Sequence, residues 1–173
     1  MATITISTKA YGDGRPAARL VLPYELRQRS RLLAVMDSGE EVGLMLPRGT
    51  VLRGGDRLQV SDGRLVEVVA APEQVSIVRS GDARTLARAA YHLGNRHVAV
   101  QLTADSLRYL CDHVLDDMLR GLGLKVDADV LPFEPEAGAY SQSQAQSPGH
   151  DHDHGHDHEH GHTHGHGHHH SHG

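Results

Sequence analysis

Residues 82–102 read DARTLARAAYHLGNRHVAVQL, a stretch that begins with a helix pattern and ends with a strand pattern. Asp82 is a favoured N-cap residue, and Ala83–Leu93 is rich in alanine, leucine and arginine with apolar positions at helical spacing. Gly94 fits the C-cap of that helix. The alternating residues His97–Leu102 then predict a strand. This half of the chain is therefore expected to mix helices with strands.

The flanking segments extend the pattern in both directions. Gln74–Arg79 alternates apolar and polar residues and predicts a strand. Asp105–Leu110 fits either a third strand or a helical turn. Val114–Leu122 predicts a helix with Val114, Leu115, Met118, Leu119 and Leu122 on one side, and Leu124–Leu131 predicts a last strand. The order strand-helix-strand-strand-helix-strand is the ferredoxin-like split βαβ pattern.

The first seventy residues predict a different architecture. Gly- and Asp-rich turn signals recur about every ten residues, which is typical of a small β-barrel or sandwich. Asp62-Gly63 predicts a hairpin turn, and Tyr24–Arg29 predicts a short helical turn. The strands are expected at Ala2–Thr8, Arg19–Leu22, Arg31–Met36, Glu41–Leu46, Thr50–Leu52, Arg57–Val60 and Arg64–Ala71.

These patterns define an α+β protein with four parts. We expect a β domain at residues 1–72, a ferredoxin-like domain at 73–140, a Ser/Gln-rich linker at 141–149 and a histidine-rich tail at 150–173. Arg27, Arg29 and Arg31 form a local basic cluster in the first domain. This cluster fits either a solvated face or a docking surface for a protein partner.

Composition excludes several classes of protein. The net charge is −5, but four of those charges lie in the tail, so the body is nearly neutral and does not resemble a nucleic-acid binder. The single cysteine, Cys111, allows no internal disulfide and suits a reducing compartment. With no signal peptide and no long apolar run, the sequence predicts a soluble cytoplasmic protein with no membrane partner.

The tail is a candidate metal-binding segment. It has no apolar residue with which to form a core, so it is expected to be disordered. Neutral imidazole binds Ni²⁺, Zn²⁺ and Cu²⁺, but a flexible run of histidines selects no single metal. An engineered tag and a pH-responsive tail are the other interpretations. The candidate ligands are His150, His152, His154, His156, His158, His160, His162, His164, His166, His168, His169, His170 and His172.

The body offers only three histidines, His92, His97 and His113. His92 and His97 are five residues apart, about 140° on a helix, so they do not form a chelating i, i+4 pair. Cys111 and His113 share a face if the segment is extended, and could then hold a metal. There is no phosphate-binding loop, no His-Glu-x-x-His and no Cys-x-x-Cys motif, so the sequence does not predict an enzyme.

Several longer motifs resemble the urease accessory protein UreE family, and the resemblance covers most of residues 1–140. The motifs are Leu22–Arg27, Tyr91–His97 followed by Val98–Leu102, Asp112–Leu119, and Pro132–Tyr140, together with the histidine-rich tail. The resemblance implies a β domain that contacts protein partners and a metal-binding ferredoxin-like domain that forms a homodimer. It also implies that the two His97 side chains of the dimer together bind one Ni²⁺ at the interface.

By this resemblance the chain is expected to be a nickel metallochaperone that delivers Ni²⁺ to apo-urease, together with the accessory GTPase UreG. Cys111 replaces a histidine that some members carry, so Cys111 and His113 form an auxiliary site in which thiolate favours Cu⁺ or Zn²⁺. Zn²⁺ and Cu²⁺ are alternatives to nickel. The rival interpretation is a metal-storage protein that uses the tail and has no dedicated recipient.

Overall fold

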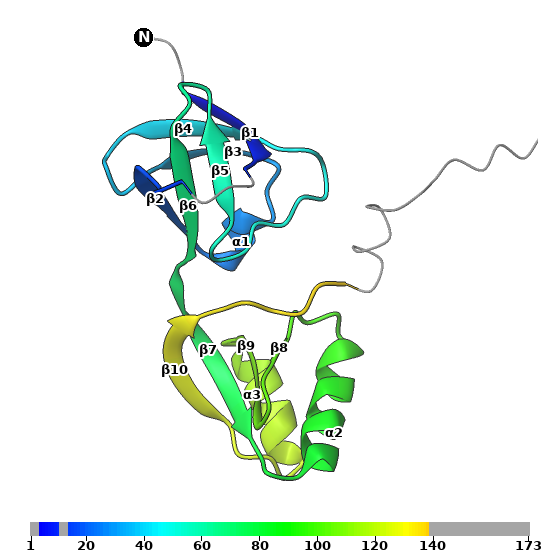
Figure 1. Cartoon of the computed structure of the whole chain (residues 1–173). Coiled ribbons are helices and arrows are strands. Elements are labelled where there is room, and N and C mark those ends of the chain that lie inside the picture. The colour runs from blue at the N-terminus through cyan, green and yellow to red at the C-terminus, as the bar shows by residue number, and fades with distance from the viewer. Residues whose placement is uncertain (1–3, 11–13, 139–173) are drawn as a thin grey trace, which may run out of the picture. The chain divides into compact units, whose positions relative to one another are not determined.

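The computed structural model describes residues 4–10 and 14–138. Within them the chain forms a six-stranded sheet, followed by a four-stranded sheet with two longer helices (Figure 1). The predicted α+β class is confirmed. The linker and the tail, with their predicted disorder, lie outside the described residues. In the part of the chain that is described, no helix combines the length and the apolar character needed to cross a membrane.

The first sheet has the order β2-β6-β5-β1-β4-β3 and nearly closes on itself. The edge strands approach where the Asp37 N–H donates to the Arg19 carbonyl (2.9 Å). The predicted hairpin at Asp62-Gly63 is confirmed, with Gly63 at a φ of 90° that glycine adopts easily. The elements are β1 Thr5–Lys9, β2 Ala18–Leu22, α1 Tyr24–Arg27, β3 Arg31–Val35, β4 Glu41–Met45, β5 Arg57–Val60 and β6 Leu65–Ala70.

The core of this sheet comes from alternating strand residues that point to one face. On β6, for example, Val66 and Val68 are buried, while Leu65, Glu67 and Val69 are only half-buried. The predicted strand Thr50–Leu52 is wrong. Leu52 is buried, but its N–H donates to the Arg27 carbonyl (2.9 Å) at the end of α1. The segment is therefore bonded to the end of this helix and does not join the sheet.

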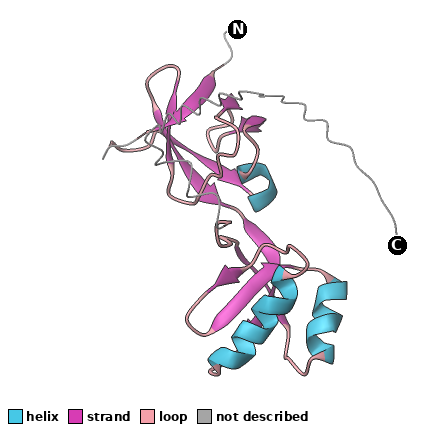
Figure 2. Ribbon diagram, turned by 90° about the vertical axis from the view of Figure 1, so that its right-hand side faces the viewer, coloured by secondary structure: helices cyan, strands magenta, loops and turns pink. Residues whose placement is uncertain are grey.

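The second sheet has the order β10-β7-β9-β8, and the split βαβ pattern is confirmed. Both longer helices cover one face of it (Figures 1 and 2). Asp105–Leu110, left open by the sequence, contains a strand. The elements are β7 Pro72–Arg79, α2 Ala83–Gly94, β8 Gln101–Leu102, β9 Ser106–Leu110, α3 His113–Gly121 and β10 Asp127–Pro132.

Strand β7 is buried on both faces. Val78 packs with the helices, in a cluster that includes Leu93 of α2 and Leu119 of α3. Val75 and Ile77 pack on the opposite face against Phe133. Two layers therefore meet at this strand, and the second layer comes from the segment that follows β10.

Both helices begin at an aspartate N-cap. Asp82 accepts hydrogen bonds from the backbone N–H groups of Arg84 and Thr85, as the sequence predicted, and Asp112 does the same for the first turn of α3. Val114 stands in the first turn of α3, in the row of apolar residues expected on one side of the helix, and it is 60% exposed.

Candidate metal site

The end of α2 forms a left-handed turn at His97. The His97 N–H donates to the Gly94 carbonyl (2.9 Å), and the Val98 N–H donates to the Leu93 carbonyl (3.2 Å). These two bonds are those of a Schellman motif, whose turning residue is usually glycine. Here that residue is His97, with a φ of 56°, and it is the one non-glycine residue with positive φ in the described ranges. The turn presents the exposed imidazole beyond the end of the helix.

This turn corrects two sequence predictions. Gly94 is not the turning residue, because the helix includes it and the chain reverses three residues later. His97–Leu102 is not a continuous strand, since only Gln101 and Leu102 join the sheet. The residues between are held differently: Val98 packs against the helix cluster, and the Val100 carbonyl accepts a hydrogen bond from the Glu136 N–H (2.8 Å).

His97 lines an open depression in the surface. Tyr24 and Gln28 from the first half of the chain line the same depression, as do Glu136 and Gly138 beyond β10. The segment 133–138 therefore runs beside the histidine. Sequence reasoning had singled out His97 but not these neighbours. Glu136 stands in the last motif of the family resemblance, which was the only signal pointing to it.

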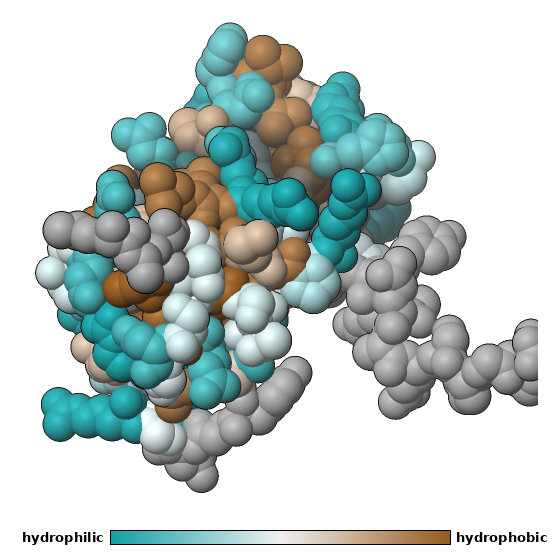
Figure 3. Space-filling view, turned by 90° about the horizontal axis from the view of Figure 1, so that it is seen from above, coloured by the Kyte–Doolittle hydropathy of each residue, from teal (hydrophilic) through white to brown (hydrophobic). Residues whose placement is uncertain are grey.

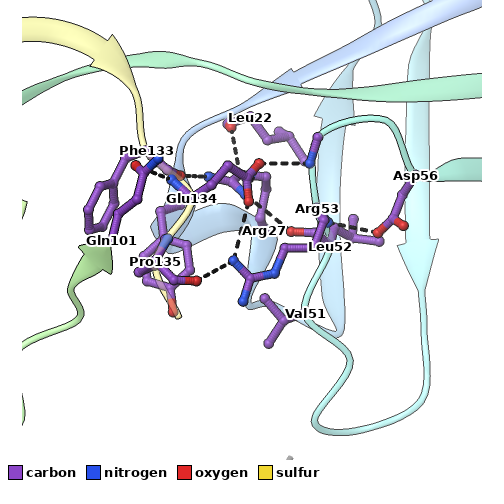
Figure 4. A network of polar contacts seen from close by, with 12 residues as sticks. Leu22, Arg27, Val51, Leu52, Arg53, Asp56, Gln101, Phe133, Glu134 and Pro135 are labelled. Carbon is purple, nitrogen blue, oxygen red and sulfur yellow. Dashed lines mark hydrogen bonds and ion pairs between the residues drawn. The ribbon is translucent and has the colours of Figure 1, made fainter. Parts of the chain in front are cut away.

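A buried arginine holds segment 133–138 in place (Figure 4). The Arg27 side chain is fully buried and donates to the carbonyl oxygens of Leu22 and Leu52 (3.2 Å each), to that of Phe133, and to the Glu134 carboxylate (2.9 Å). The Gly54 N–H donates to the same carboxylate (2.7 Å). We call this set of contacts the Arg27 latch. Because Arg27 is buried here, it does not belong to the surface cluster expected with Arg29 and Arg31.

The auxiliary residues Cys111 and His113 are both exposed. Strands β8 and β9 are antiparallel, so the start of β8, which follows His97, and the end of β9, which precedes Cys111, lie at the same end of the sheet. Cys111 and His113 consequently lie toward the same end of the sheet as His97. No group of three side chains suited to one metal ion occurs among the described residues. The described part of the chain thus offers separate ligands and no group of three.

The start of α3, which carries His113, is rigidly held. The Asp112 carboxylate accepts from the Val114 N–H (2.8 Å), and the buried Tyr109 hydroxyl donates to Asp116 (2.6 Å). Burial raises the pKa of Tyr109, so the phenol keeps its proton and stays a donor. His92 lies on α2 with its ring edge-on to that of Tyr91. The tail histidines lie outside the described residues.

Comparison with known proteins shows the family of this chain. Residues 5–71 match the model of the UreE urease accessory protein N-terminal domain, and residues 73–162 match that of its C-terminal domain. A urease accessory protein UreE from Alkalilimnicola ehrlichii is 58% identical over 134 residues, which is 77% of this chain and 82% of that protein. A urease accessory protein UreE from Citrobacter koseri is 58% identical over 125 residues, which is 72% of this chain and 82% of that protein.

The chain therefore belongs to the UreE family of urease accessory proteins. The family resemblance seen in the sequence is confirmed. Membership assigns the chain to urease maturation as a chaperone and not as an enzyme, which agrees with the sequence prediction.

Proposed function

We propose that the protein is a nickel metallochaperone that captures Ni²⁺ and delivers it to apo-urease during assembly of the urease metallocentre. The observation that carries this proposal is the position of His97. An exposed imidazole in a left-handed turn is held at a backbone conformation that glycine would adopt with less strain. Such strain is typical of functional positions.

One imidazole per chain binds a metal weakly, but a twofold axis between two chains would bring two imidazoles together. We propose that two chains associate as a homodimer through residues 73–140 and that His97 of each supplies one ligand to a shared Ni²⁺. Two imidazoles leave coordination positions open. Open positions suit a carrier, because an incoming ligand from the recipient can bind before the old ligands leave.

Cys111 and His113 form a proposed auxiliary site near the same end of the sheet. Their side chains flank Asp112, whose carboxylate is occupied as the helix cap. A thiolate and an imidazole together favour softer ions, so this site is assigned to Cu⁺ or Zn²⁺ rather than to nickel.

The tail, His150–His172, is proposed as a reservoir for nickel, with Zn²⁺ and Cu²⁺ as competing ions. The last described residue, Gly138, lines the same depression as His97. His150 is twelve positions further along the chain, so the first tail histidine can be at most about 40 Å away from Gly138. A tether of this length raises the local concentration of metal-bound imidazoles at His97.

The proteins that would receive the nickel are proposed from the family to which the chain belongs. We propose that delivery takes place in the cytoplasm, within a complex that contains apo-urease and the accessory GTPase UreG, which supplies nucleotide hydrolysis. Residues 1–72 form the part assigned to partner contacts. Nickel binding needs neutral imidazole, so affinity is expected to fall as the pH drops through about 6.5.

Metal storage is the rival function, and urease activation separates the two. Delivery predicts that protein ending at Tyr140 still binds about one Ni²⁺ per dimer and still activates urease when nickel is plentiful. It also predicts that His97→Gly in the full chain impairs activation, while Gly123→Ala serves as a matched control at the end of α3. If truncation abolishes activation and His97→Gly leaves it intact, storage replaces delivery.

A further inference from the structure

The depression beside His97 contains a second side chain that can bind a metal ion. His97 and Glu136 both line it, and they bring an imidazole and a carboxylate to one surface feature. Nitrogen and oxygen ligands of this kind are typical of Ni²⁺ and Cu²⁺ sites. Among the described residues that line the depression, only Glu136 carries a formal charge at neutral pH. The depression therefore offers a negative charge to a cation held by the histidine.

The rest of the lining is mostly apolar, with Ala90, Val98, Val100 and Leu102 among its residues. Apolar residues reach the surface elsewhere too, as the brown patches on the face seen from above show (Figure 3). An apolar lining alone therefore does not mark a binding site in this protein. The pair of side chains suited to a metal ion sets this depression apart.

The backbone of Glu136 is fixed close to the turn that carries His97. The Glu136 N–H donates to the carbonyl of Val100 (2.8 Å), three residues after His97. Two residues before it, the Glu134 N–H donates to the side-chain oxygen of Gln101 (3.0 Å). The segment thus passes Gln101 first and Val100 next, and it runs toward the histidine.

The residues just before Glu136 are anchored as well. Phe133 is fully buried, and its carbonyl accepts a hydrogen bond from Arg27 in the Arg27 latch. Pro135 is buried, and its carbonyl accepts one from the Arg53 side chain. A side chain on a fixed backbone loses less entropy when it binds an ion than one on a free loop. The Glu136 carboxylate is therefore well placed to act as a ligand.

The two glutamates of this segment are used differently. The Glu134 carboxylate pairs with Arg27 (2.9 Å) and Arg53 (3.3 Å), and it accepts from the Gly54 N–H (2.7 Å). Glu136 is exposed, and within the described ranges its carboxylate has no hydrogen bond and no ion pair. Arg53 lines another depression together with Glu136, but it is already paired with Glu134. The folded chain thus uses Glu134 and leaves Glu136 free for a ligand.

We propose that the Glu136 carboxylate binds, together with His97, the nickel ion that the protein carries. The inference rests on the proposed function. In the proposed homodimer, two imidazoles and two carboxylates surround one ion, and the two negative charges balance the charge of Ni²⁺. A tetragonal set of nitrogen and oxygen ligands is typical of Ni²⁺, and its axial positions stay open to an incoming ligand. Carboxylate is harder than thiolate, so Glu136 favours Ni²⁺ over Cu⁺ at this site.

Calorimetric nickel titration of the full-length protein tests the proposal. Glu136→Gln keeps the size of the side chain and removes its charge, and it should weaken the strongest nickel site about tenfold. Glu41→Gln is the matched control and should keep the wild-type affinity. Glu41 is also exposed and has no ion pair within the described part of the chain, but it lies on β4 and does not line the depression. All variants carry the same tail, so a difference between them reports on the folded part.

Salt concentration distinguishes a bound ligand from attraction between distant charges. Raising sodium nitrate from about 0.1 M to about 1 M shortens the screening length from about 10 Å to about 3 Å. A carboxylate bound to the ion keeps its effect, so the affinities of wild type and Glu136→Gln should still differ about tenfold. If the difference disappears at high salt, the carboxylate acts only through its charge, and the proposal is overturned.

His97→Gly in the same titration separates the failure of this inference from that of the proposed function. If His97→Gly weakens the strongest site and Glu136→Gln does not, Glu136 is not a ligand and nickel delivery stands. If neither variant weakens it, the proposed nickel site fails as a whole. If only Glu136→Gln weakens it, the ion is not shared with His97, which also overturns the proposal. Thermal unfolding without metal should be unchanged in Glu136→Gln, and a lower melting temperature would assign Glu136 a structural role instead.

Discussion

The two helices of the second domain end in the same way but with different residues. In α3 the Gly123 N–H donates to the Arg120 carbonyl (2.9 Å) and the Leu124 N–H donates to that of Leu119 (3.0 Å). In α2 the same pair of bonds surrounds His97. Gly123 has a φ of 82° and His97 has a φ of 56°. The turn after α3 therefore has glycine, which adopts a positive φ easily, and the turn after α2 has histidine, which does not.

The difference separates stability from function. A residue with a Cβ in the left-handed region costs about 1 kcal/mol relative to glycine. Gly123 has no Cβ and avoids this strain. His97 is strained, and its exposed imidazole lies beyond the end of the helix. Stability alone therefore gives no reason for histidine at this position, whereas the proposed metal binding does.

The surroundings of the two turns differ as well. The turn at His97 adjoins segment 133–138, whose Glu136 N–H bonds to the Val100 carbonyl. That segment is fixed by the Arg27 latch. Among the described residues, the end of α3 makes no backbone hydrogen bond to this segment. The comparison can therefore be tested at the latch, at either turn, and at the N-cap of α2.

The largest effect is expected from Arg27→Ala. It removes one of the two arginines that pair with the partly buried Glu134 carboxylate, leaving Arg53, and it removes donors from three carbonyl groups. The free energy of unfolding should therefore fall by about 3 kcal/mol. Chemical denaturation measures this. Arg29→Ala is the matched control, because its pair with Glu25 is exposed and should contribute less than about 0.5 kcal/mol. Equal losses for the two variants would show that the latch does not stabilise the domain.

Gly123→Ala should have an intermediate effect. Alanine at a φ of 82° is strained, so the free energy of unfolding is expected to fall by about 1 kcal/mol. No atom lies within 4 Å of the added Cβ, so steric overlap does not contribute. His97→Ala should change stability by less than about 0.5 kcal/mol, because both residues carry a Cβ. A similar loss for both variants in thermal unfolding would remove the contrast between the turns.

The smallest effect concerns pH and the N-cap Asp82. Hydrogen bonds from the Thr85 side chain and the Arg84 backbone hold the pKa of Asp82 below its usual value. A lowered folded-state pKa gives stability that is present above the unfolded pKa and lost as the pH falls through the folded one. Wild-type stability should therefore drop below about pH 4 more steeply than that of Asp82→Asn. Identical acid profiles for the two proteins would contradict this.

Much of the fold follows from local sequence signals. The Asp82 N-cap, the helical period of α2 and the Asp62-Gly63 hairpin each depend on neighbouring residues, and each was predicted correctly. The failures involve distant contacts. Leu52 has the apolar character of a strand residue, but its N–H bonds to the end of α1. Arg27 resembles a surface cation until segment 133–138, over a hundred residues later, buries it.

The candidate site shows the same division. His97 was singled out by the family motif and is exposed, and its role as a metal ligand stays a prediction. Its left-handed backbone was not predicted, because Gly94 is the residue that normally forms such a turn. The depression beside His97 also could not be predicted, since it combines Tyr24, Gln28 and Glu136 from distant parts of the chain.

Nickel affinity and stability of His97→Gly, measured on the same sample, test the central claim most directly. Calorimetric titration is compared with chemical denaturation, in the full chain and in protein ending at Tyr140. The account predicts that the strongest nickel site weakens by about tenfold or more. It also predicts that the free energy of unfolding without metal stays equal or rises by about 1 kcal/mol. Unchanged nickel affinity in the tail-free protein, or loss of stability together with affinity, would contradict it.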